Sequence, residues 1–155
     1  SAIDDAMTAR DHVRDNELDT LGGKFTFPFP RQLYYAADAS AWLEDQGAAT
    51  ADLADQALRA YGEYQPSERS FVDESVARTD VALALLRASE IEGAATALRP
   101  VLDLSPSERV GGVVVNTSRI AAALSSPHLA SSALGRDLRE EVELFNGSTA
   151  AKLII

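Results

Sequence analysis

The sequence predicts an all-α fold of about seven helices, arranged as an α-solenoid of antiparallel helix pairs. Residues 54–69 (ADQALRAYGEYQPSER) are repeated forty residues later as residues 94–109 (AATALRPVLDLSPSER), with eight of the sixteen positions identical. Each copy contains the end of one amphipathic helix, a proline turn and the start of the next helix. A repeat of this length built from helix–turn–helix units is typical of solenoids, which present binding surfaces.

Composition limits the classes of protein that need to be considered. A chain of 155 residues that is 46% hydrophobic and 25% charged is an ordinary globular domain. The absence of cysteine excludes disulfides and cysteine-based zinc sites and fits a reducing cytoplasm. A net charge of −10 opposes binding to phosphate backbones, so this segment alone is not expected to bind nucleic acid. No apolar run reaches the roughly 20 residues that span a bilayer, and no signal-peptide pattern opens the chain. We therefore expect a cytoplasmic protein with no membrane partner.

The first 29 residues are expected to form a helix followed by an arm. Residues 3–14 have a helical pattern, and Gly22-Gly23 ends a short helical turn. Residues 24–30 (KFTFPFP) alternate aromatic side chains, which indicates an extended segment, and their two prolines exclude a central strand.

Six helices, forming three pairs, are then expected between residues 30 and 145. Pro30 suits the first turn of a helix, Gly47 closes that helix, and Thr50 is a favourable N-cap for the next. The expected helices are 30–46, 50–64, 67–88 (with Ser70 as the other start), 91–104, 107–125 and 131–145.

Residues 91–104 have the clearest helical periodicity of these, although Pro100 inside them should bend the helix. The sequence Ser105-Pro106-Ser107-Glu108 has the form of a capping box and predicts the start of the next helix. Gly111, Gly112 and three valines favour a strand as the alternative there. After Pro127 breaks the chain, the last helix is expected to face inward with Leu134, Leu138, Val142 and Phe145. Asn146-Gly147 should end it, leaving 146–155 as a tail after one domain over residues 1–145.

The two repeats resemble the tetratricopeptide motif. In the second copy the small, large and proline positions of that motif are occupied by Ala82, Leu85, Ala94, Leu98 and Pro106, and Ser89 stands at the usual inter-helix glycine. The first copy fits with a longer loop, through Ser40, Leu43, Gly47, Ala54, Leu58 and Pro66. The spacing of about 40 departs from the usual 34, so the repeats are degenerate.

Longer stretches resemble the region that follows the helix-turn-helix in a group of actinobacterial (Streptomyces-type) transcriptional regulators. These are VRDNELDTLGGKFTFPFPRQLYYAADASAWL, ALRPVLDLSPSERVGGVV and RDLREEVELF. The resemblance implies the regulatory half of such a protein, which binds a peptide, a protein or a small effector. The alternative is a structural module that only dimerises or scaffolds the regulator.

Catalytic and metal-binding motifs are lacking. His12 and His128 are the only histidines and lie at opposite ends of the chain. Neither a phosphate-binding glycine loop nor a nucleophile elbow is present. We therefore expect no enzyme activity, no metal and no cofactor.

The candidate binding residues come from the helices that line the groove in tetratricopeptide proteins. Aligning 76–79 (VART) with 117–120 (TSRI) places Arg78 and Arg119 at equivalent positions, where they could hold a carboxylate or phosphate together. Tyr34 and Asn116 could add stacking and hydrogen bonds. The alternative is that each arginine pairs with a nearby acid, such as Asp80, Glu74 or a residue of the last helix.

Overall fold

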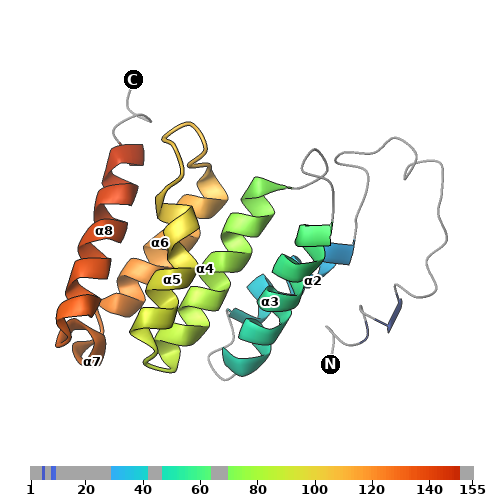
Figure 1. Ribbon diagram of the computed structural model, residues 1–155, viewed down its shortest axis with the longest axis horizontal. Coiled ribbons are helices and arrows are strands. Elements are labelled where there is room, and N and C mark those ends of the chain that lie inside the picture. The colour runs from blue at the N-terminus through green and yellow to red at the C-terminus, as the bar shows by residue number, and fades with distance from the viewer. Residues whose placement is uncertain (1–4, 6–7, 10–28, 42–46, 64–69, 151–155) are drawn as a thin grey trace.

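The structure, a computed structural model, describes residues 5, 8–9, 29–41, 47–63 and 70–150 (Figure 1). All regular structure in these ranges is helical, which confirms the predicted all-α class and rejects the strand alternative at residues 113–115. The expected arm over residues 24–28, most of the expected first helix, and residues 151–155 lie outside the described ranges. The helices are α2 (Phe29–Ala41), α3 (Gly47–Glu63), α4 (Phe71–Arg87), α5 (Ile91–Leu102), α6 (Gly111–Leu124), α7 (Pro127–Ala130) and α8 (Ala133–Ala150).

The helices lie side by side along the long axis of the molecule, with α8 at one end and α2 and α3 at the other (Figure 1). Helix α4 is central and packs against α2, α3, α5 and α6, while α8 packs against α6 and α5. The largest apolar cluster lies among α4, α5, α6, α7 and α8, and includes Leu86, Leu98, Ile120, Leu124 and Val142. None of the described helices is long and apolar enough to cross a membrane.

Helix α4 has clear start and stop signals. The Ser70 hydroxyl accepts a hydrogen bond from the Asp73 amide at 3.2 Å, and acidic residues in the first turn suit the helix dipole. At the other end Ser89 has a positive φ of 64°, its N–H donates to Leu86, and the Glu90 N–H donates to Leu85. This is a Schellman motif, whose left-handed position favours glycine. Ser89 therefore has a backbone conformation that favours glycine. This agrees with its alignment in the sequence to the inter-helix glycine of the motif.

Helix α5 follows the periodicity of the sequence closely. Its buried side chains are Ala94, Leu98 and Val101, and the helix continues through Pro100. Ala54 and Ala94, which are equivalent in the repeat, are both fully buried. The shared alanine therefore marks a position where two helices approach closely.

The predicted capping box does not start a helix. Helix α6 begins at Gly111, four residues later than expected, and residues 105–108 form a turn instead. The Glu108 N–H donates to the Ser105 carbonyl at 2.9 Å, and the Glu108 carboxylate accepts from the Ser105 N–H at 2.9 Å. Because the four residues satisfy one another, Ser105 does not cap a following helix. Hydrogen bonds to this carboxylate from the Ser105 hydroxyl, at 2.6 Å, and from the Ser105 N–H lower the pKa of Glu108.

The last part of the chain is more helical than predicted. Pro127 starts the short helix α7, where its ring suits the first turn. Helix α8 runs to Ala150, so the helix end predicted at Asn146-Gly147 is wrong. The Asn146 side chain accepts a hydrogen bond from the Thr117 hydroxyl at 2.6 Å, which holds this turn against α6.

Candidate functional site

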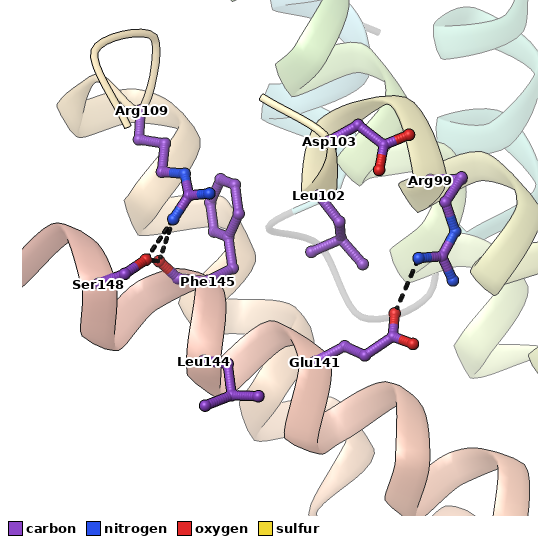
Figure 2. A pocket seen from close by; sticks show the side chains of 8 residues that line it. All are labelled: Arg99, Leu102, Asp103, Arg109, Glu141, Leu144, Phe145 and Ser148. Carbon is purple, nitrogen blue, oxygen red and sulfur yellow. Dashed lines mark hydrogen bonds and ion pairs between the residues drawn. The ribbon is translucent and has the colours of Figure 1, made fainter. Parts of the chain in front are cut away.

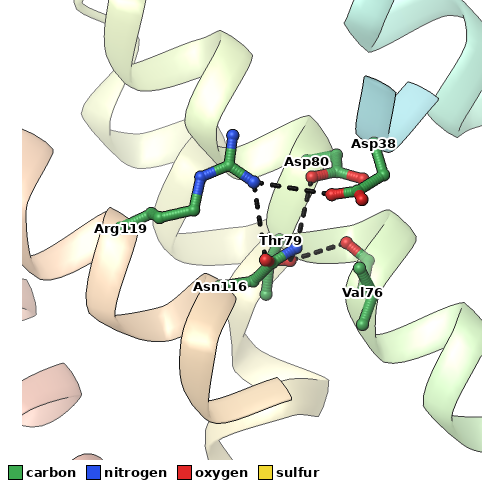
Figure 3. Close-up of polar contacts among 6 residues, drawn as sticks. All are labelled: Asp38, Val76, Thr79, Asp80, Asn116 and Arg119. Atoms are coloured by element: carbon green, nitrogen blue, oxygen red, sulfur yellow. Dashed lines mark hydrogen bonds and ion pairs between the residues drawn. The ribbon is translucent and has the colours of Figure 1, made fainter. Parts of the chain in front are cut away.

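A buried group of polar side chains lies where α2, α4 and α6 meet (Figure 3). Helix α2 contributes Asp38, α4 contributes Thr79 and Asp80, and α6 contributes Asn116 and Arg119. We call these five residues the Asp80 cluster. Its members come from three helices because α4 packs against both of the others.

Asn116 connects the members of the cluster. Its side-chain N–H group donates to the Thr79 hydroxyl at 3.2 Å and to Asp80 Oδ1 at 3.4 Å. Its side-chain oxygen accepts from Arg119 Nη1 at 3.4 Å. Thr79 in turn donates to the Val76 carbonyl at 2.6 Å within α4. The amide nitrogen therefore joins α6 to α4, while the amide oxygen contacts Arg119 one turn along the same helix.

Asp80 is the least satisfied member. It is 1% exposed, and its second carboxyl oxygen, Oδ2, makes no hydrogen bond with any described residue. Burial and, to a smaller extent, the charge of Asp38 together raise the pKa of Asp80 to about 8, against the opposing effect of Arg119. At neutral pH the carboxyl is therefore mostly protonated. A buried oxygen without a partner costs free energy, because water can no longer solvate it.

Arg119 and Asp38 form an ion pair beside Asp80. Arg119 Nη1 lies 3.5 Å from Asp38 Oδ1, and the two side chains are 17% and 29% exposed. Charge-assisted N–H···O bonds normally measure about 2.7–2.9 Å, so this contact is long. Since both side chains reach solvent and Asp80 does not, the pair lies between Asp80 and the surface.

Two tyrosines of α2 lie next to each other, and Tyr34 is one helical turn before Asp38. Tyr34 is half-buried, and burial followed by the charges of Asp38 and Asp73 raises the pKa of its hydroxyl. Its ring centroid lies 4.7 Å from that of Tyr35, which is 51% exposed.

A second polar group, on the first turn of α4, is better satisfied. Asp73 Oδ2 accepts from Arg31 Nε at 3.0 Å and from the Tyr61 hydroxyl at 2.9 Å. These contacts join α2, α3 and α4 with ordinary lengths. These contacts stabilise the packing of the three helices. By comparison, the hydrogen bonds between side chains of the Asp80 cluster are longer.

Of the residues proposed from the sequence, Asn116 and Arg119 contact each other. Arg78 precedes Asp80 by two residues, which is about 200° around the helix, so it lies on the other side of α4. Arg119 pairs instead with an acid, as the alternative interpretation held, although Asp38 was not among the acids considered.

Sequence reasoning also missed Thr79 as a member of this site. One signal was available: Asp80 lies inside the apolar stretch VARTDVALALL, where a charged residue is out of place. A carboxylate on the buried side of a helix is often part of a functional site.

A hollow of about 380 Å³ lies between α5, α8 and the turn at residues 103–110 (Figure 2). Arg99 pairs with Glu141 across it at 3.1 Å. Arg109 donates to the carbonyls of Leu104 at 3.0 Å and Phe145 at 3.2 Å, and its guanidinium lies 4.2 Å from the Phe145 ring centroid. Both arginines already donate to acceptors within the protein. The hollow is therefore a poor candidate for an anion-binding site. Arg109 fastens the turn to α8.

In the described part of the chain, no group of three or more histidine, cysteine, aspartate or glutamate side chains is placed to hold a metal ion. Comparison with known proteins finds no matching family model, no matching curated protein and no matching solved structure. The functional argument therefore depends on the geometry of the chain itself.

Proposed function

We propose that this chain is a ligand- or protein-binding regulatory domain of a bacterial transcriptional regulator, built as a tetratricopeptide-like solenoid of antiparallel helix pairs. The proposed pairs are α2–α3, α4–α5 and α6–α8. Two packing relations support this arrangement: α4 contacts both α2 and α6, and α5 contacts α8. The first helices of successive pairs are thus neighbours, and so are the second helices of the last two pairs, as expected for stacked repeats. The regulatory role is supported by the sequence resemblance to actinobacterial regulators.

The Asp80 cluster is the observation that carries the binding proposal. Replacing buried polar groups by apolar residues of similar size is often neutral or stabilising, so folding alone does not require them. The free-energy cost of burying Asp80 is high, because its side chain is 1% exposed and its Oδ2 makes no hydrogen bond with any described residue. Strongly perturbed ionisable groups gather at functional sites. We infer that the surface formed by α2, α4 and α6 around this cluster is the binding site.

A ligand screen by two-dimensional NMR tests this proposal. The isotope-labelled chain is mixed with pools of small carboxylic acids, amines, nucleotides and short peptides. We expect at least one pool to shift the side-chain amide of Asn116 and the backbone amides of Asp38 and Asp80. Asn116→Ala should remove this response. Ser118→Ala, on the exposed side of the same helix, should keep it.

The same sample distinguishes the structural alternative. Sedimentation of the same sample measures its oligomeric state. If no pool shifts the signals of the cluster and the chain sediments as a stable dimer, the domain is a dimerisation module. A monomer with a ligand response at the cluster supports the binding function.

A further inference from the structure

We propose that the Asp80 cluster is a receptor for a primary ammonium group, carried either by a lysine side chain of a partner peptide or by a free aliphatic amine. This inference rests on the proposed binding function and specifies the chemistry of its ligand. The proposal replaces the anion that the sequence suggested.

In the Asp80 cluster, several hydrogen-bond acceptors have no donor at normal hydrogen-bond length. Asp80 Oδ2 has no hydrogen bond with any described residue. Asp38 Oδ1 and the Asn116 oxygen receive Arg119 only at 3.5 and 3.4 Å. Three oxygens from three helices are therefore available to a cation that can approach them more closely. An anion would instead meet two carboxyl groups.

An ammonium group fits this set better than the resident guanidinium. It is compact and carries three N–H donors that rotate on a flexible stem, whereas a guanidinium is planar and holds its donors in a fixed fork. The three donors correspond in number to Asp38, Asp80 and Asn116.

Entry requires Arg119 to release both Asp38 and the Asn116 oxygen. Arg119 and Asp38 are partly exposed, and their 3.5 Å contact is long. Swinging Arg119 outward would uncover Asp80 without moving a helix. The net charge of −10 attracts cations to the surface from solution.

Proton release distinguishes this site from a non-specific acidic surface. The groups that face Asp80 are Asp38 and Tyr34 of α2 and Arg119 of α6, and no titratable group of α3 or α5 acts on it among the described residues. With a pKa of about 8, Asp80 holds a proton at pH 7, and an ammonium ion would displace that proton into solvent. Amines stay protonated in this range. Affinity should therefore rise with pH, by up to about tenfold per unit, until it levels near pH 8.

Isothermal calorimetry of the whole chain tests the proposal, with 1,4-diaminobutane and a short capped peptide containing one lysine as probes. Titrations at pH 7 in two buffers of different ionisation enthalpy measure the protons released. We expect binding of at least one probe with release approaching one proton. Tighter binding of the peptide would assign the ammonium to a partner's lysine, and tighter binding of the diamine to a free amine.

Matched variants make the result decisive. Asp80→Asn should weaken binding at least tenfold and abolish proton release, whereas Asp137→Asn, the same substitution on the exposed side of α8, should alter neither. Arg119→Gln should tighten binding, because it removes the competing cation. Equal binding by the two aspartate variants, or no binding of either probe, would overturn the ammonium proposal. A non-amine ligand found at the cluster by NMR would overturn it too while leaving the binding function intact.

Discussion

Replacing Asp80 by asparagine should change how the stability of the fold depends on pH. The carboxyl has a pKa of about 8 in the folded chain, compared with 3.8 for an unperturbed group. Below pH 4 both the folded and the unfolded states are protonated, so burial of Asp80 carries no charge cost. Between pH 4 and pH 8 the unfolded chain loses this proton while the folded chain keeps it. The free energy of unfolding therefore falls as pH rises, and levels above pH 8.

The size of the effect follows from the two pKa values. Each unit of difference corresponds to about 1.4 kcal/mol, so the four units set an upper limit of roughly 6 kcal/mol. Water reaching the ionised carboxylate reduces this, and we expect Asp80→Asn to be about 3 kcal/mol more stable than the native chain at pH 9. At pH 4 the two should differ little, because asparagine has the size of the protonated acid.

Urea unfolding followed by circular dichroism at several pH values between 4 and 9 measures this difference. Asp137→Asn is the matched control, since Asp137 is exposed on α8 and its replacement should leave the slope unchanged. Parallel stability curves for the native chain and Asp80→Asn would refute the reasoning. They would mean that Asp80 ionises freely in the folded state.

Three further substitutions test the packing. Leu98→Ala, at a fully buried site in the main apolar cluster, should lower the free energy of unfolding by about 2–5 kcal/mol, and an unchanged urea midpoint would show that α5 packs differently. Ser89→Gly should stabilise the chain by about 1 kcal/mol, because Ser89 has a φ of 64°, and a lower thermal midpoint would contradict the Schellman geometry. Gly135→Ala should destabilise by about 1–3 kcal/mol, since its Cβ would lie 2.2 Å from the Leu129 carbonyl oxygen, and unchanged stability would mean that α7 and α8 do not approach so closely.

Sequence patterns predicted the parts of the fold that depend on local chemistry. The apolar periodicity of residues 91–104 correctly identified Leu98 as buried, and the last helix buries Leu138, Val142 and Phe145 as expected. The capping box misled because Ser105 and Glu108 can close a turn on themselves as readily as they can begin a helix. The helix end at Asn146 was misplaced because its side chain is used by Thr117, twenty-nine residues away in the chain.

The site could be predicted only in part, since its geometry depends on packing between distant helices. Tyr34, Asn116 and Arg119 were identified from the helices on which they lie. Arg119 meets Asp38 across 81 residues of sequence, and the aligned segments did not include α2. The repeat register also equated Arg78 with Arg119, whereas the position of Asp80 on α4 shows that Arg78 lies on the other side of the helix.

The most direct test of the account is the titration of the Asp80 carboxyl itself, followed by carbon NMR of selectively labelled aspartate. The account rests on a buried, incompletely bonded carboxyl held among α2, α4 and α6. It predicts a midpoint near pH 8 for Asp80, together with a shift of the Asn116 side-chain amide at the same pH, because Asn116 donates to Asp80 Oδ1. A midpoint near 4 with no response from Asn116 would contradict both the burial of Asp80 and the cluster built around it.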